Sequence, residues 1–394
     1  MKIIIILFWI LLSLVIYSYV GYPIILYILV KIKSLFSQKK EENNNNISLP
    51  EVTLFVAAYN EKDYIATKME NHLNLNYPKN KIKHLWVTDG SNDGTPELLK
   101  KYPEVIVLHE NKRNGKIGAI NRGKKYITTP IVIFSDGNTI LSKNSIKIIV
   151  DLFKDSKVGC VAGEKRIYNK NIDDATGSGE SFYWKFESKI KKWDAELYSA
   201  VGAAGELFAV RTELLEEVEP DTILDDFIIS LRIVKKGYTI KYNPKAYAIE
   251  TASANIKEEL KRKIRISAGS IQSIIRLKSL LNPFKYGIFS WQFFSHKIAR
   301  WIIVPFSLPI IYILNALIIL KMQSINNIYT LLFFLQTIFY LFVFIGWIFK
   351  NKKIKFKLIF IPYYIYIMNY AVWVGLYRFI RGKQTVNWER AKRA

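Results

Sequence analysis

We predict an α/β domain flanked by N-terminal and C-terminal transmembrane helices. Three features of the sequence support this fold class: residues 3–30 carry no charge, short β-rich apolar runs alternate with amphipathic stretches over residues 51–254, and three long apolar runs follow residue 301. About 20 apolar residues suffice to cross a bilayer. Continuous apolar strands separated by single helices indicate βαβ units whose sheet is covered on both faces.

The N-terminal segment, residues 1–30, is expected to form a transmembrane helix. A cleaved signal peptide is the alternative, but the apolar run exceeds the roughly 7 to 15 residues of a signal-peptide core and no A-x-A site follows it. Several lysines follow the run whereas only Lys2 precedes it, which predicts that the chain is cytoplasmic from residue 31 onward. Residues 31–50 include four consecutive Asn and are interpreted as a polar linker.

Residues 51–254 are predicted to fold into the α/β domain. The expected strands are Val52–Ala58, His84–Thr88, Val105–Leu108, Ile131–Ser135 and Val158–Ala162, and the expected helices cover residues 62–73, 95–101, 116–127 and 143–153. The single cysteine, Cys160, has no partner for an intrachain disulfide, so it is expected to be a small buried hydrophobe.

Residues 255–300 are expected to lie along the membrane or on the α/β domain, because their first part has the pattern of a basic amphipathic helix. Residues 301–380 form the predicted C-terminal membrane region, and residues 381–394 form a basic tail. If all three apolar runs of this region cross, the tail lies outside, contrary to the positive-inside rule. The last run contains Pro362 and Asn369, which suit a re-entrant segment, so both two and three spans remain open.

The charge of the chain, +24 from 57 Lys and Arg against 33 Asp and Glu, is unevenly distributed. Residues 282–394 hold 15 basic residues and one acidic residue, beside the longest apolar runs. This distribution favours an anionic membrane surface over nucleic acid as the partner. Walker A, G-x-G-x-x-G, H-E-x-x-H and nucleophile-elbow motifs are absent, which argues against P-loop kinases, dehydrogenases, zinc proteases and lipases.

Polar side chains occur where three of the predicted strands end. Asn60 and Glu61 follow the first strand, Asp89 follows the second, and Asp136 and Asn138 follow the fourth. Because ligands bind beyond the carboxyl ends of the strands in such sheets, we expect one pocket. The short D-x-D-like pair, Asp136 and Asn138, could hold Mg²⁺ or Mn²⁺ that bridges two phosphates. The stretch around Asp89 equally fits a tight turn.

Basic residues further along the chain could meet phosphate. Lys116 lies in a stretch that opens a helix, where basic groups and backbone amides suit phosphate oxygens, although a solvated loop fits that stretch as well. Arg262 and Arg265 are three residues apart and share a helix face, so they could bind a diphosphate or meet anionic lipid.

Two loops hold the remaining candidates. Asp225 and Asp226 precede an apolar run, where they could cap a helix or include a general base. Gly205 and Glu206 end a run of small residues that would let a bulky ligand approach the backbone, or would form a flexible turn.

Taken in order, eight motifs resemble those of the membrane-anchored family-2 glycosyltransferases, the group that contains cellulose, hyaluronan and poly-N-acetylglucosamine synthases. They are AAYNE, TDGSNDGT, NGKIGAIN, FSDGNT, GAAGELFAVR, LDDF, RKIRISAG and SHKIARW, and they cover roughly residues 51–305. The resemblance implies a GT-A, Rossmann-like domain that binds a nucleotide diphospho-sugar.

The resemblance also implies roles for the candidate residues. Asp226 matches the last residue of the family's T-E-D element, the general base that deprotonates the acceptor hydroxyl. The residues expected to bind the nucleotide-sugar are Asn60, Glu61, Asp89, Lys116, Asp136 and Arg265. Those expected near the acceptor and the diphosphate are Gly205, Glu206, Asp225 and Arg262. The metal, Mg²⁺ or Mn²⁺, is expected on Asp136 and Asn138.

Three departures from the family pattern bear on the activity. Asn138 replaces the second Asp of D-x-D and carries no charge, and Asp225 replaces the Glu of T-E-D. Ile266 stands where the Q-x-x-R-W element has its Trp, so the aromatic platform of polymerising members is missing there. With one preceding span and at most three following ones, whether the enzyme is processive and exports its product stays open.

The resemblance implies an inverting, metal-dependent transfer of a sugar, expected to come from a UDP-sugar, to a glycan or lipid-linked acceptor in cell-surface or extracellular polysaccharide synthesis. The protein is expected in the plasma or inner membrane, with its catalytic domain in the cytoplasm and with the bilayer and other polysaccharide-assembly proteins as partners. One alternative is a non-processive transferase that adds one sugar to a polyprenyl phosphate or diphosphate lipid. Another is a membrane transporter with a cytoplasmic α/β domain.

Overall fold

The computed structural model describes residues 1–36, 49–168, 175–322, 327–349 and 357–387. Most of the predicted linker 31–50 and the end of the predicted tail 381–394 lie outside these residues. The strands are β1 (Val52–Ala58), β2 (Ile82–Asp89), β3 (Val105–Glu110), β4 (Ile131–Ser135), β5 (Ile140–Leu141), β6 (Val158–Tyr168), β7 (Leu207–Arg211) and β8 (Thr239–Thr251).

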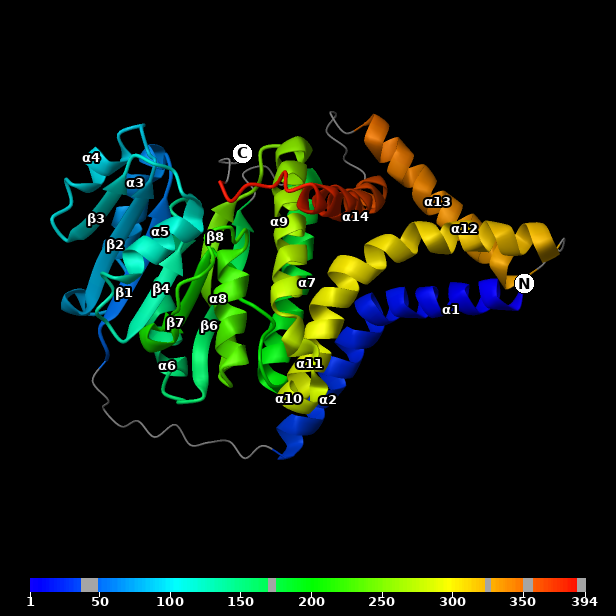
Figure 1. Cartoon of the computed structure of the whole chain (residues 1–394), viewed down its shortest axis with the longest axis horizontal. Coiled ribbons are helices and arrows are strands. Elements are labelled where there is room, and N and C mark those ends of the chain that lie inside the picture. Colours follow the sequence, from blue (N-terminus) through cyan, green and yellow to red (C-terminus); the bar gives the residue numbers. More distant parts are fainter. Residues whose placement is uncertain (37–48, 169–174, 323–326, 350–356, 388–394) are drawn as a thin grey trace.

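Helices cover the sheet, and helices from both ends of the chain extend away from it (Figure 1). Those of the α/β domain are α3 (Ile65–Leu73), α4 (Thr95–Leu99), α5 (Gly115–Lys124), α6 (Ser145–Leu152), α7 (Ala175–Leu197) and α8 (Asp225–Lys235). The others are α1 (Lys2–Ile16), α2 (Tyr22–Phe36), α9 (Ile256–Arg276), α10 (Pro283–Tyr286), α11 (Ile288–Phe293), α12 (Val304–Met322), α13 (Ile328–Ile348) and α14 (Lys357–Ile380).

The described strands form one eight-stranded sheet in the order β3-β2-β1-β4-β7-β6-β8-β5. The first four strands run parallel, as the βαβ pattern predicts, and β7 runs antiparallel between β4 and β6. The α/β fold class is therefore confirmed. The reversed β7 has a functional consequence, because its first residue pairs with the last residue of β4, Ser135 with Leu207. The segment before β7 thus reaches the edge at which the parallel strands end.

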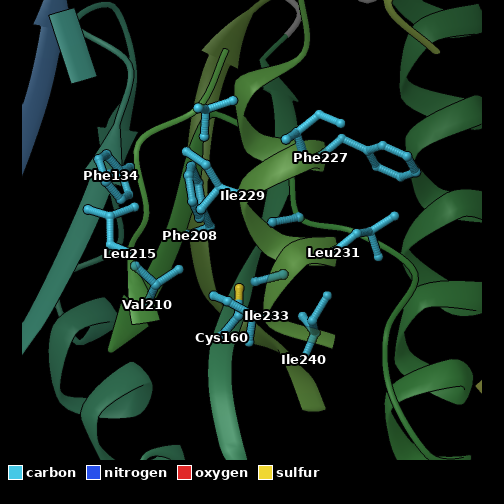
Figure 2. Close-up of a cluster of buried hydrophobic side chains, with 14 of the residues drawn as sticks. Phe134, Cys160, Phe208, Val210, Leu215, Phe227, Ile229, Leu231, Ile233 and Ile240 are labelled. Carbon is cyan, nitrogen blue, oxygen red and sulfur yellow. The ribbon is translucent and has the colours of Figure 1, made fainter. Parts of the chain in front are cut away.

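A hydrophobic cluster packs between the sheet and α8 (Figure 2). Phe134, Phe208 and Phe227 belong to it, and each is at most 4% exposed. Cys160 is also buried there, as predicted. Because Phe134 and Phe227 stand within two residues of Asp136 and Asp226, this packing holds the backbone of both acids in place.

Three segments among the described residues are long and apolar enough to cross a membrane: Lys2–Phe36, Ile288–Met322 and Ile328–Ile348. The structure therefore has candidate membrane helices near both ends of the chain, as predicted. The first segment changes direction between α1 and α2, where a π-helical turn, Tyr17–Gly21, interrupts it (Figure 1). A second π-helical stretch, Phe294–Ile303, precedes α12.

A buried ionic network joins the membrane helices to α7. The ring nitrogens of His296 lie 2.6 Å from Asp194 Oδ2 and 3.0 Å from Glu187 Oε1. Tyr22 of α2 donates to Asp194, and Arg300 donates to Glu187 over 3.0 Å. These groups come from three separate segments, so the network attaches both the N-terminal helix and the C-terminal membrane region to the α/β domain.

The C-terminal helix α14 packs on α9, and the tail that follows it returns to the α/β domain. At Gly375 the α14 backbone lies so close to α9 that an added Cβ would stand 2.9 Å from the backbone nitrogen of Ala268. An added Cβ at Gly115, which begins α5, would stand 3.1 Å from the Val386 side chain. The described part of the tail therefore lies against the α/β domain, while the choice between two and three C-terminal spans stays a prediction.

Candidate active site

Five predicted site residues meet at the edge where β4 ends. Lys116 comes from α5, Asp136 follows β4, Glu206 precedes β7, and Asp225 and Asp226 open α8. The reversal of β7 brings the loop before it to this edge, and α8 begins beside the same loop. Residues separated by more than a hundred positions in the sequence thus form one charged cluster.

Lys116 lies at the centre of this cluster. Its Nζ is 2.7 Å from Asp136 Oδ1 and 3.5 Å from Asp225 Oδ2. Burial acts to lower the pKa of the Lys116 ammonium, but Asp136, Asp225 and Asp226 outweigh it and raise this pKa above its usual value. The lysine is therefore cationic at any working pH.

The carboxyl group of Asp226 has a raised pKa, as a general base that works at neutral pH requires. Burial and, to a lesser extent, Asp225 raise the pKa of Asp226, Lys116 acts against them, and the resulting pKa is about 7. Its Oδ1 accepts the N–H of Phe227 over 2.8 Å, which orients the carboxyl at the start of α8. A base whose pKa lies near the working pH transfers protons most effectively.

Gly205 lies directly against the catalytic candidates. A Cβ added there would stand 2.9 Å from Lys116 Nζ and 3.4 Å from Asp226 Oδ2. The small residue thus leaves room for the two charged groups to approach the loop before β7.

We expect Gly205→Ala to lower kcat by at least tenfold, because its methyl group displaces the Lys116 ammonium and small misplacements in a site cost about this much or more. The lysine end is flexible, so the melting temperature should change by no more than about 2 °C. Steady-state kinetics and thermal unfolding check this together. An unchanged kcat would show that the position of Lys116 does not limit the reaction.

A second ionic group, which connects Glu206 to Asn138, lies beside this cluster. Lys165 of β6 pairs with both Glu206 and Glu250. Asn138 donates its side-chain N–H to Glu250 Oε1 over 3.1 Å. Burial raises the pKa of Glu206, but Lys165 outweighs it and lowers that pKa below its usual value. Sequence analysis missed Lys165 and Glu250, because both lie on strand segments that were not predicted.

Asn60, which follows β1, and Asp89, which ends β2, form hydrogen bonds with neighbouring loop residues. Asn60 has a positive φ of 54°, and its amide exchanges hydrogen bonds with Asn92 over 3.0 and 3.1 Å. Asp89 is fully buried and accepts the N–H groups of Asn114 and Gly115, with the shortest distance 2.8 Å. Burial raises the pKa of Asp89, and these two N–H groups act against the rise.

These contacts show that the stretch around Asp89 is a structural turn. Gly90 and Gly94 have positive φ values of 74° and 90°, which other residues rarely adopt, and Asp93 accepts the N–H of Thr95. The contribution of Asn60, Glu61 and Asp89 to nucleotide binding stays a prediction.

The two arginines of α9 have different surroundings. Arg262 pairs with Glu180 and Glu259, at 2.5 and 3.0 Å, so its guanidinium belongs to a buried ionic group. Arg265 lies closer to the site: burial lowers the pKa of its guanidinium, and Asp225 and Asp226 act against this. Of the two, Arg265 is the better placed to meet a diphosphate.

Lys68 of α3 supports the turn that carries Asp136, and sequence analysis missed it. Its side chain is fully buried, and its Nζ donates to Ser135 Oγ over 2.7 Å, to the Thr139 carbonyl over 2.7 Å and to Thr139 Oγ1 over 3.1 Å. Burial lowers the pKa of Lys68 to about 7. The available signal was a lysine on the apolar face of α3, next to Met69.

The oxygen atoms after β4 suit a divalent cation. Mg²⁺ usually binds one or two protein carboxylates together with substrate phosphates. Asp136 supplies a carboxylate, and the oxygen of the Asn138 amide is not used by its contact with Glu250. The described residues contain no group of three His, Cys, Asp or Glu placed to hold a metal by themselves. The site therefore fits an ion that is held jointly with a diphosphate.

Comparisons with known proteins agree with this architecture. Residues 53–219 match the family model described as glycosyl transferase family 2. Over 251 residues the chain is 29% identical to a poly-beta-1,6-N-acetyl-D-glucosamine synthase of Staphylococcus aureus, which covers 61% of this chain and 60% of the relative. It is 24% identical over 261 residues to the probable glycosyltransferase YdaM of Bacillus subtilis, with the same coverage. The chain thus matches about 60% of the length of these curated relatives.

A solved structure has a similar fold over nearly the whole chain. The mannosyltransferase PcManGT from Pyrobaculum calidifontis, in complex with GDP-Man and Mn²⁺, superposes with a TM-score of 0.67 at 20% identity. The match covers 96% of this chain and 99% of the other. At this identity the likeness shows the fold, which is the GT-A fold of glycosyltransferases.

Proposed function

Because residues 53–219 match the family model described as glycosyl transferase family 2, we propose that this protein transfers a sugar from a UDP-sugar to a hydroxyl group of a glycan or lipid-linked acceptor. The observation that carries the proposal is the charged cluster at the end of β4. There Lys116 contacts Asp136 and lies 3.5 Å from Asp225, beside the perturbed carboxyl of Asp226. Such a cluster combines a base with a cation that can stabilise a leaving group.

In the proposed reaction, Asp226 takes the proton of the acceptor hydroxyl while the acceptor oxygen attacks the anomeric carbon. The bond from that carbon to the diphosphate oxygen breaks, and the nucleoside diphosphate leaves. Lys116 and Arg265 stabilise the negative charge of the departing diphosphate. A single displacement inverts the configuration and requires no protein nucleophile.

Asp136 and Asn138 are the residues that would hold Mg²⁺ or Mn²⁺, and a bound ion would supply further positive charge to the diphosphate. We place the α/β domain in the cytoplasm of a plasma or inner membrane protein, because the lysines that follow the first span favour that side. The polysaccharide synthase among the relatives supports a role in cell-surface or extracellular polysaccharide synthesis, with other assembly proteins as partners.

The donor and the product can be tested in one incubation of membranes with a panel of labelled nucleotide-sugars and Mn²⁺. We expect one UDP-sugar to label a product, EDTA to abolish the labelling, and Mn²⁺ or Mg²⁺ to restore it. The size of the product separates a polymer from the single-sugar adduct of a non-processive transferase. If none of the donors labels a product, the proposed function is wrong, and labelling that resists EDTA removes the metal from it.

A further inference from the structure

A cavity of about 520 Å³ lies away from the candidate active site, between the end of α8 and the turn that joins α10 to α11. It is lined by Tyr198, residues 234–237 and residues 285–289. We call it the α8–α11 cavity. In Figure 1 its helices α10 and α11 lie next to α2, at the opposite end of the domain from the C-terminal tail.

The lining of the cavity presents donors that lack protein acceptors. Lys235 and Lys285 are exposed, and neither has an ion-pair partner in the described part of the chain. Their neighbour Lys236, by contrast, pairs with Glu216 at 2.7 Å. The hydroxyl of Tyr286 is buried and has no hydrogen-bond partner among the described residues. The Lys285 ammonium also lies 5.5 Å from the centre of the Tyr286 ring, which leaves its N–H groups available to an acceptor. Two ammonium groups without a carboxylate partner among the described residues suit an anionic oxygen ligand such as a phosphate.

Exposed apolar side chains surround the mouth of the same cavity. Phe284, which precedes the lining residue Lys285, is 99% exposed, and Ile288 is 39% exposed. Along α2 an exposed apolar stripe recurs every three or four residues, which places it on one helix face: Ile24, Ile28, Ile32 and Leu35.

The α2 stripe ends beside the cavity. Lys33 Nζ donates to the Leu197 carbonyl over 2.7 Å, and the next residue, Tyr198, lines the cavity. At about 100° per residue Lys33 lies on the side of α2 opposite the stripe, so the stripe and the basic cavity lie near the same end of α2 but on different faces. Exposed apolar groups next to lysines are typical of a surface that lies in the headgroup layer of an anionic bilayer.

The length of the adjoining candidate span agrees with this location. Ile288 lines the cavity and also begins the segment Ile288–Met322, which has 35 residues. A helix of that length is about 52 Å long, whereas the hydrocarbon core of a bilayer is about 30 Å thick. Part of the segment must therefore lie outside the hydrocarbon, and the basic cavity marks this end as the one at the headgroups.

We propose that the α8–α11 cavity binds the phosphate-bearing headgroup of an anionic phospholipid. The Lys235 and Lys285 ammonium groups donate to the phosphate oxygens, and Phe284 lies among the acyl chains. This binding does not depend on sugar transfer, and it would orient the domain on an anionic membrane surface.

The test measures thermal unfolding of the full-length protein in a zwitterionic detergent. Short-chain phosphatidylglycerol should raise the melting temperature by about 2 to 4 °C, because a ligand that binds only the folded state stabilises it. Matched short-chain phosphatidylcholine should leave the temperature unchanged. Inorganic phosphate at the same concentration should produce less than a third of the shift, since it lacks acyl chains.

The double variant Lys235→Gln/Lys285→Gln should lose at least half of the phosphatidylglycerol shift. The matched control Lys100→Gln/Lys101→Gln removes two exposed lysines that follow α4 and should keep the full shift. Three outcomes overturn the proposal: an equal shift with phosphatidylcholine, an equal shift with inorganic phosphate, or a full shift in the Lys235→Gln/Lys285→Gln variant.

Discussion

Asp226→Asn is expected to abolish sugar transfer while it leaves binding of the UDP-sugar within about threefold of the native affinity. The amide keeps the shape of the side chain but cannot take a proton, and a general base contributes roughly 10²- to 10⁴-fold to a rate. Transfer should therefore fall by at least about a hundredfold. Single-turnover transfer assays and equilibrium binding of the donor measure the two effects separately.

The pH profile provides an independent test of the same residue. Burial and Asp225 raise the pKa of Asp226 to about 7, and only the deprotonated carboxylate can accept a proton. The native rate should therefore rise with pH through about 7 and then level off, and the residual rate of Asp226→Asn should lack this rise.

Asp151→Asn is the matched control, since Asp151 is an exposed residue of α6 that pairs with Lys154 at 2.6 Å. It should retain the native rate and pH profile. Near-native turnover of Asp226→Asn would assign the base to another group.

Lys116→Met is expected to lower transfer by about a hundredfold or more and also to weaken donor binding. The variant removes the cation that lies between Asp136 and Asp225. The negative charges of the two carboxylates and of the incoming diphosphate then repel one another, because no ammonium group neutralises them. Because Lys116 acts to lower the pKa of Asp226, the midpoint of any remaining pH profile should move above 7.

The matched control for this variant is Lys112→Met, which removes an exposed lysine from the loop before α5. It should show native kinetics. If Lys116→Met binds the donor normally and keeps its pH midpoint, the lysine supports only the fold of the cluster. Measured melting temperatures of both variants separate that result from simple unfolding.

Local sequence patterns predicted the parallel half of the sheet well. The strands β1 and β4 have the predicted bounds, because they are buried apolar runs that end in polar residues. The predictions missed β7 and β8, whose identity depends on pairing with distant strands. The antiparallel insertion of β7 cannot be predicted from its five residues, since strand direction leaves no trace in a short apolar run.

Several residues were placed correctly in sequence but have partners that only the structure identifies. Arg262 and Arg265 look equivalent on one helix face, yet Arg262 pairs with Glu180 of α7. Lys68 looks like an ordinary helical lysine in the sequence, but in the structure its ammonium group donates hydrogen bonds to Ser135 and Thr139, on either side of the turn after β4. In both cases the partner lies more than 60 residues away.

The positively charged C-terminal region is another case in which the sequence raised a question and the structure identified a contact. The sequence showed that a third C-terminal crossing conflicts with the positive-inside rule. In the structure Val386 of the tail lies against Gly115 of the α/β domain, and the number of C-terminal crossings stays a prediction.

The sequence by itself determined the membrane segments, the α/β class and the set of polar residues at the strand ends, because hydropathy, periodicity and turn chemistry are local properties of a chain. Tertiary structure alone decided that β7 runs antiparallel to its neighbours, that Lys116 lies among three acidic residues and that the pKa of Asp226 is raised. Those features arise from burial and from charges that meet across long separations, and the energy of a buried charge depends on the groups around it rather than on its neighbours in sequence.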